Sequence, residues 1–175
     1  RVIGEIQSDI AGKKPMLRLV QGDVGSGKTL VAAAPALTAI SSGYQVAVMA
    51  PTELLAEQHR RNFGDWFSAF AIEPAWLTGS VKGKQREQTL ASIRSGSASI
   101  VIGTHALFQE GVDFARLGLV IVDEQHRFGV HQRLSLSAKA GQPQRAHQLI
   151  MTATPIPRTL SMVAYADPDC SVLDE

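Results

Sequence analysis

The chain has 175 residues, of which 45% are hydrophobic and 19% are charged, and its formal net charge is +1 at pH 7. This length suits one domain, and the composition is typical of a globular α/β protein rather than a disordered or fibrous one. The small net charge excludes a module that coats nucleic acid by bulk electrostatics, so any DNA contact must be local. The single cysteine, Cys170, excludes an internal disulfide and fits a reducing cytosol.

The sequence has no apolar run that approaches the roughly 20 residues needed to span a bilayer, and its first residues lack a signal-peptide pattern. We therefore expect a cytoplasmic protein with no membrane partner. The chain begins with Arg1 and stops at Glu175 without a tail, and we interpret it as a piece of a longer protein.

Short apolar runs alternate with longer segments of helical period. The runs predict buried strands at residues 17–21, 46–50, 75–77, 99–102, 119–122 and 148–151. The segments between them predict helices at residues 28–40, 53–70 and 83–93. Repeated strand-helix units predict an α/β fold with a doubly wound parallel sheet, in which ligands bind beyond the carboxyl ends of the strands.

A glycine-rich loop lies between the first predicted strand and the first predicted helix. It reads Gly22, Asp23, Val24, Gly25, Ser26, Gly27, Lys28 and Thr29. The spacing matches G-x-x-x-x-G-K-[ST], whose backbone amides surround phosphates at a helix N-terminus. Lys28 would reach the β and γ oxygens of a nucleotide, and Thr29 would ligate Mg²⁺. Small-molecule kinases, GTPases and motors share this loop, so it does not identify the reaction.

A second acidic loop follows the run at 119–122 and reads Asp123, Glu124, Gln125 and His126. Asp123 is a candidate partner for Mg²⁺, and Glu124 is a candidate base that orients an attacking water. A kinase must keep water from the terminal phosphate, so this acidic pair favours an ATPase; a solvated acidic turn is the alternative. The five histidines show no zinc-site spacing, so we do not expect them to bind a metal.

Two short segments, 59–61 and 82–86, carry local clusters of basic residues. Each is explained equally well by a solvated helix face.

Six loops, in this order, resemble the motifs of the superfamily 2 helicases. Residues 22–29 resemble motif I, 50–54 motif Ia, 77–80 motif Ib, 102–105 the next DNA-facing motif, 123–126 motif II and 152–154 motif III. The resemblance covers nearly the whole chain. It implies a RecA-like P-loop domain that uses ATP and Mg²⁺.

The same resemblance implies roles for residues outside the nucleotide loop. The DNA-facing set would be Pro51, Thr52, Thr78, Gly79, Thr104 and His105. The set that links the nucleotide state to DNA would be Gln125, His126, Thr152 and Thr154. The threonines could offer hydroxyls and helix N-terminal amides to backbone phosphates, although each is equally well explained as a helix cap.

Within the superfamily, residues 123–130 and 151–160 resemble two bacterial branches. One contains helicases that reverse forks and migrate Holliday junctions, and the other contains transcription-repair coupling factors. Gln125 favours the first branch, because coupling factors usually carry glutamate there. This branch implies translocation on duplex and branched DNA in recombination and repair, a nucleoid location and single-strand-binding protein as a partner. A small-molecule kinase and a degenerate scaffold are more remote alternatives.

The resemblance also implies that residues 1–175 are the first RecA-like domain alone. The family's wedge domain and its glutamine-containing adenine motif would precede Arg1, and the second RecA-like domain, which supplies an arginine finger, would follow. We therefore expect the isolated chain to bind ATP or ADP weakly and to hydrolyse ATP slowly, if at all.

Overall fold

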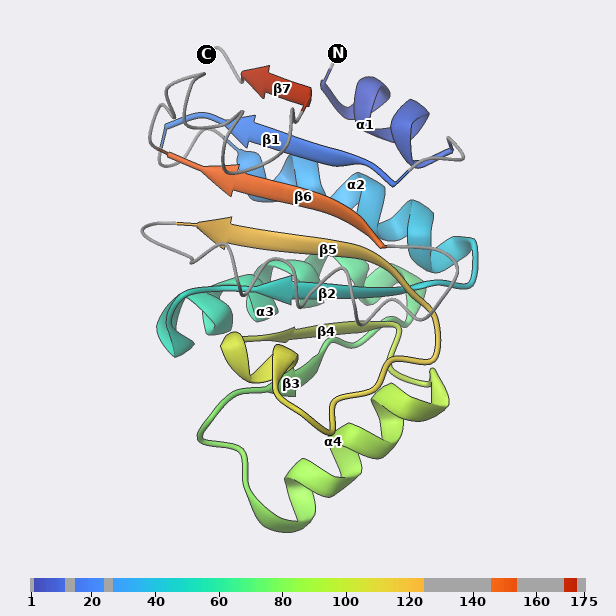
Figure 1. Cartoon of the computed structure of the whole chain (residues 1–175), viewed down its shortest axis with the longest axis vertical. Helices are drawn as coiled ribbons and strands as arrows, with labels where there is room; N and C mark the ends of the chain where they lie inside the picture. The colour runs from blue at the N-terminus through green and yellow to red at the C-terminus, as the bar shows by residue number, and fades with distance from the viewer. Residues whose placement is uncertain (1, 12–14, 24–26, 125–145, 154–168, 173–175) are drawn as a thin grey trace.

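The computed structural model describes residues 2–11, 15–23, 27–124, 146–153 and 169–172 (Figure 1). The strands within these ranges are β1 (Leu17–Gln21), β2 (Gln45–Met49), β3 (Ala75–Leu77), β4 (Ile100–Gly103), β5 (Leu117–Glu124), β6 (His147–Thr152) and β7 (Asp169–Val172). The helices there are α1 (Val2–Ile10), α2 (Lys28–Ser41), α3 (Glu53–Phe67) and α4 (Gly83–Ser95), with 3-10 turns η1 (Ser68–Phe70) and η2 (His105–Phe108).

The strands of the described ranges form one sheet in the order β3-β4-β2-β5-β6-β1-β7. Every pairing between neighbours in this sheet is parallel. The carboxyl ends of the strands therefore lie along one edge of the sheet (Figure 1).

Helices cover both faces of the sheet, as the alternation of buried residues along β5 shows. Leu119 and Ile121 pack into the cluster that contains the apolar residues of α1, α2 and α3. Val120 and Val122 point the other way, into the cluster that contains Ile93 of α4. In Figure 1, α2 and α3 accordingly lie together behind the sheet. The predicted doubly wound parallel α/β fold is confirmed.

All six predicted strands are present, each within two residues of its expected ends. The helix predicted at 53–70 was wrong at its end, because α3 stops at Phe67 and η1 follows it. Ala71 then takes a left-handed conformation with φ 54°, which closes the turn. Two further elements, α1 and β7, were not predicted. Among the described strands, β7 lies at the edge of the sheet and pairs with β1 alone, so its sequence need not be the apolar run that a central strand requires.

Gly103 allows β3 and β4 to approach closely. A Cβ atom at this position would lie 1.8 Å from the carbonyl oxygen of Leu77, far inside van der Waals contact. Any larger residue would therefore push apart the two strands whose following loops carry Thr78 and Thr104.

Gln45, the first residue of β2, joins this strand to α4 and to the residue that precedes β5. Its side chain is 3% exposed and donates to the carbonyl oxygens of Ile93 at 2.9 Å and Ala98 at 3.0 Å. Its Oε1 accepts from the Arg116 amide at 2.9 Å. These bonds connect the start of β2 to the end of α4 and to the approach to β5.

None of the described helices is long and apolar enough to cross a membrane.

We predict that Gln45→Leu lowers the free energy of unfolding by about 2–4 kcal/mol, because it leaves buried backbone groups without partners. Urea denaturation followed by circular dichroism would measure the change. Gln88→Leu, on the exposed face of α4, is the matched control and should change stability by less than about 0.5 kcal/mol. Equal effects of the two substitutions would contradict the role assigned to Gln45.

Candidate functional site

The loop after β1 is tied to the neighbouring strand and opens directly into α2. The Gly22 amide donates to the carbonyl oxygen of Thr152 at 3.2 Å. Gly27 caps α2 with φ 80°, a left-handed conformation that favours glycine. Its carbonyl accepts the amide of Val31 at 3.0 Å, as the first turn of the helix requires. The loop therefore presents the N-terminus of α2 at the edge where the strands end, a position suited to anions. Residues 24–26 lie outside the described ranges.

Lys28 folds back over this loop. Its Nζ donates to the carbonyl oxygens of Gly22 and Asp23, each at 2.5 Å. The ammonium is thus held against the backbone of the loop that follows β1.

Asp123, near the end of β5, bonds to a helix on the face of the sheet. Its Oδ2 lies 2.6 Å from Nε2 of His59 in α3. The carboxylate side chain is 16% exposed and that of His59 is 6% exposed. His59 therefore does not belong to a solvated basic face, although Arg60 and Arg61 beside it are exposed.

A cleft of about 300 Å³ joins the phosphate loop to Asp123. One side is formed by residues 27–30 at the start of α2, and the other by the face of α3 that carries His59. Met151 and Ala153, at the end of β6, form part of its wall. The cleft thus brings Lys28, Thr29 and Asp123 into one space.

Thr152 lies on β6, between the strand that precedes the glycine-rich loop and the strand that carries Asp123. It pairs in register with Gln21 of β1 on one side and with Glu124 of β5 on the other. It is 2% exposed, and its carbonyl accepts the Gly22 amide at 3.2 Å. Of the predicted linking residues, Gln125, His126 and Thr154 lie outside the described ranges, and so does the side chain of the predicted base, Glu124.

The predicted DNA-facing loops follow β2, β3 and β4, which are neighbours in the half of the sheet away from the phosphate loop. Thr52 is exposed and caps α3, because its hydroxyl accepts the amide of Leu55 at 3.3 Å. Thr78 is fully buried and Thr104 is 3% exposed. The groups that solvent reaches in these loops include Gly79 and His105, with Pro51 partly exposed.

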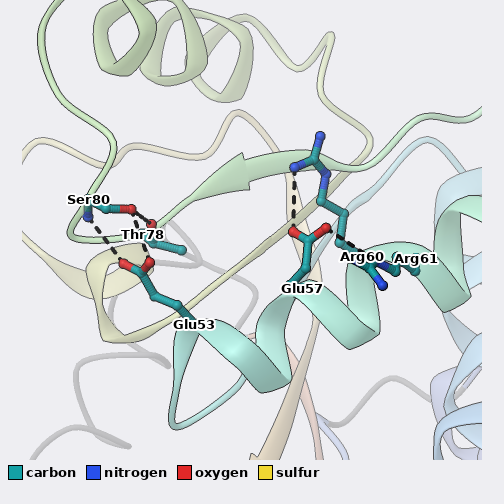
Figure 2. Close-up of polar contacts among 6 residues, drawn as sticks. All are labelled: Glu53, Glu57, Arg60, Arg61, Thr78 and Ser80. Atoms are coloured by element: carbon teal, nitrogen blue, oxygen red, sulfur yellow. Dashed lines mark hydrogen bonds and ion pairs between the residues drawn. The ribbon is translucent and has the colours of Figure 1, made fainter.

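Glu53 links two of these loops, as Figure 2 shows. Its carboxylate accepts the backbone amide of Ser80 at 3.3 Å and the Ser80 hydroxyl at 3.1 Å. The Ser80 hydroxyl also bonds to that of Thr78 at 2.8 Å. The first turn of α3 is therefore bound to the loop after β3, and the Thr78 hydroxyl already has a partner.

The DEAD/DEAH box helicase profile matches residues 4–163. This chain belongs to the DEAD/DEAH box helicase family. It is 64% identical over 177 residues to the ATP-dependent DNA helicase RecG of Escherichia coli K12 and 62% identical over 176 residues to that of Haemophilus influenzae. Each alignment covers the whole chain and 25% of the relative, so the chain spans about a quarter of those proteins.

A solved structure described as RecG bound to a three-way DNA junction has the same fold, with a TM-score of 0.84 and 44% sequence identity. The match covers 99% of this chain and 23% of that one. The RecA-like helicase fold and the resemblance to RecG are thus confirmed. Membership of the helicase family removes the small-molecule kinase alternative.

The donors in the cleft fit a magnesium ion. Thr29 and Asp123 offer oxygen atoms, which are the ligands that Mg²⁺ prefers, and this ion commonly takes its remaining ligands from water and phosphate. Among the described residues, no group of three or more His, Cys, Asp or Glu side chains could hold a metal by itself.

Sequence reasoning missed two residues of this site, His59 and Glu53. The spacing of Ala56, Phe63 and Phe67 marks the buried face of α3 and places His59 on it, so periodicity could have separated His59 from its basic neighbours. The bond from Glu53 to Ser80 joins residues 27 positions apart, and no local pattern signals it.

We predict that Thr52→Ala lowers the free energy of unfolding by about 1 kcal/mol, because α3 loses its N-terminal cap. Thr52→Ser keeps the capping oxygen and should remain close to the parent. Chemical denaturation of the three proteins measures this difference. If the alanine and serine variants were equally stable, the cap would contribute nothing.

Proposed function

We propose that this chain is the ATP-binding motor domain, the first of two RecA-like domains, of a longer DNA helicase. The full-length protein would couple ATP hydrolysis to translocation on duplex DNA, for fork reversal and Holliday-junction branch migration in recombination and repair. The observation that carries the proposal is the cleft that unites Lys28, Thr29 and Asp123. Identity of 62–64% to helicases named RecG supports this branch over the transcription-repair coupling factors.

In this proposal residues 22–29 hold the phosphates of ATP. Backbone amides at the start of α2 would bind their oxygens, and Lys28 would exchange its bonds to Gly22 and Asp23 for the β and γ oxygens. Glu124 would orient the attacking water and accept its proton.

Thr29 and Asp123 would hold Mg²⁺, with Asp123 already oriented by His59. When bound, this ion would neutralise charge that develops on the phosphate oxygens. Thr152 would sense the result, because it pairs with the ends of both β1 and β5. Thr154, Gln125 and His126 complete the proposed link to the DNA side.

The proposed DNA-facing set remains Pro51, Thr52, Thr78, Gly79, Thr104 and His105. Because Thr78 and Thr104 are buried, we propose different roles for the buried and the exposed residues of this set. The buried threonines would shape their loops, while the exposed residues and backbone amides would meet phosphates. Contacts of this kind position DNA without reading its sequence.

The partners that we propose are duplex and branched DNA and the second RecA-like domain of the same chain. A solved relative described as bound to a three-way DNA junction supports the first. The second would supply an arginine finger, which contributes about 10³- to 10⁵-fold in turnover. Single-strand-binding protein and a cytoplasmic, nucleoid-associated location follow from the same branch of bacterial helicases.

The proposal is tested by ATP hydrolysis in the full-length protein with and without a branched DNA. We expect the junction to stimulate turnover. Glu124→Gln should lower stimulated turnover by about 10²- to 10⁴-fold, because the water loses its base, while leaving ATP binding intact. Lys28→Ala, the matched control, should weaken ATP binding itself. ATP turnover that is equal with and without DNA, or that is unchanged by Glu124→Gln, would refute the assignment.

We predict that His126→Ala in the full-length protein leaves ATP binding intact and lowers DNA-stimulated turnover, because His126 would lie between the nucleotide and residues 152–154. The comparison is the ratio of turnover with DNA to turnover without it. An unchanged ratio would remove His126 from the linking set.

We predict that the isolated chain of 175 residues binds ADP weakly and shows no DNA-stimulated turnover, because its site would lack the facing domain. Calorimetry with ADP and a phosphate-release assay would measure both. Turnover near that of the full-length protein would show that this chain needs no second domain.

A further inference from the structure

We propose that His59 is a positioning residue for the metal-side carboxylate Asp123. The inference rests on the proposed function, since it concerns how the ATP site holds its divalent cation. His59 is a member of none of the helicase motifs recognised in the sequence, yet its ring lies 2.6 Å from the Asp123 carboxylate.

The hydrogen bond to Asp123 indicates which nitrogen of the His59 ring carries the proton. Oδ2 of Asp123 is a carboxylate oxygen and accepts, so the proton lies on Nε2 of His59. The other ring nitrogen, Nδ1, is buried and has no hydrogen-bond partner among the described residues. An unsatisfied buried acceptor costs free energy. Within the described part of the chain, the bond to Asp123 is therefore the ring's one hydrogen bond.

Anchoring one carboxylate oxygen orients the other. With Oδ2 held at 2.6 Å, rotation of the carboxylate is restricted and Oδ1 is left for the cleft that Lys28 and Thr29 also line. Groups that hold a metal ligand in place in this way commonly change metal affinity by about 10- to 100-fold when they are removed.

The surroundings of His59 keep the ring rigid. The whole residue is 5% exposed. It lies on the face of α3 that packs against the sheet, one turn before the buried Phe63. Phe63 itself makes edge-to-face contacts with Trp66 and Phe67. A helix anchored by this aromatic group gives the imidazole little freedom, so Asp123 receives its donor from a fixed position.

Two substitutions separate donation from packing. His59→Gln places an amide nitrogen near the position of Nε2 and retains a donor, whereas His59→Leu fills a similar volume and has none. Both would be made in the full-length protein. Binding of Mn²⁺ to the protein–ADP complex, followed by electron paramagnetic resonance, reports the metal site without requiring turnover. ADP affinity in EDTA and the urea midpoint of each variant report the phosphate loop and the fold.

We expect His59→Leu to weaken Mn²⁺ binding by about 10- to 100-fold and His59→Gln to recover most of that loss, with ADP affinity in EDTA equal in all three proteins. Mn²⁺ affinity of the leucine variant equal to the parent's would overturn the inference while leaving the proposed function intact. Equal losses in both variants would overturn it too, because packing would then be the cause. A parent that binds no ADP would overturn both.

A measurement on the unsubstituted protein keeps the inference open to refutation should the leucine variant fail to fold. Nitrogen-15 NMR of labelled histidine, assigned by difference from His59→Gln, reports the tautomer in the metal-free protein. We expect the Nε2–H form. A proton on Nδ1 alone would leave Nε2 without a hydrogen to donate and would overturn the inference.

Discussion

Parallel pairing is the constraint on which the site depends. Because each described strand runs in the same direction, residues at matching register reach the same edge of the sheet. The position of β6 between β5 and β1 then decides which strand ends are brought together. Thr152 pairs with Gln21 before the phosphate loop and with Glu124 at the end of β5, and its carbonyl accepts the Gly22 amide. One strand end thus holds the two halves of the proposed ATP site at a fixed separation.

Helix α3 connects the loop after β3 to the end of β5 along this edge of the sheet. Its first residue, Glu53, binds Ser80 in the loop after β3 (Figure 2). His59, six residues later and about 9 Å along the helix axis, binds Asp123 beside the phosphate loop. Buried aromatic residues at its far end fix the helix to the core. A rigid helix with these two polar contacts is physically suited to hold the proposed nucleotide site and the proposed DNA-facing loops at a constant distance from each other.

The sequence predicted the parts that local chemistry determines. The bounds of β1 and β3 matched because these runs are short, apolar and closed by turn residues, and the phosphate loop was recognised because its spacing follows from phosphate geometry. The contacts of His59 and Glu53 could not be predicted in the same way, since each depends on the placement of α3 over the sheet. Thr78 and Thr104 show the converse: their position after a strand is readable, but their burial is decided by tertiary packing.

The central proposal is that this chain is one domain of a longer protein that moves along duplex DNA. Displacement of a fluorescent third strand from a triplex tests it most directly, because the third strand is released only when a motor passes along the duplex beneath it. The account predicts that the full-length protein displaces the strand with ATP, that it does not do so with a non-hydrolysable analogue, and that Asp123→Ala abolishes displacement. Displacement without hydrolysis, or none by a protein that hydrolyses ATP on branched DNA, would contradict it.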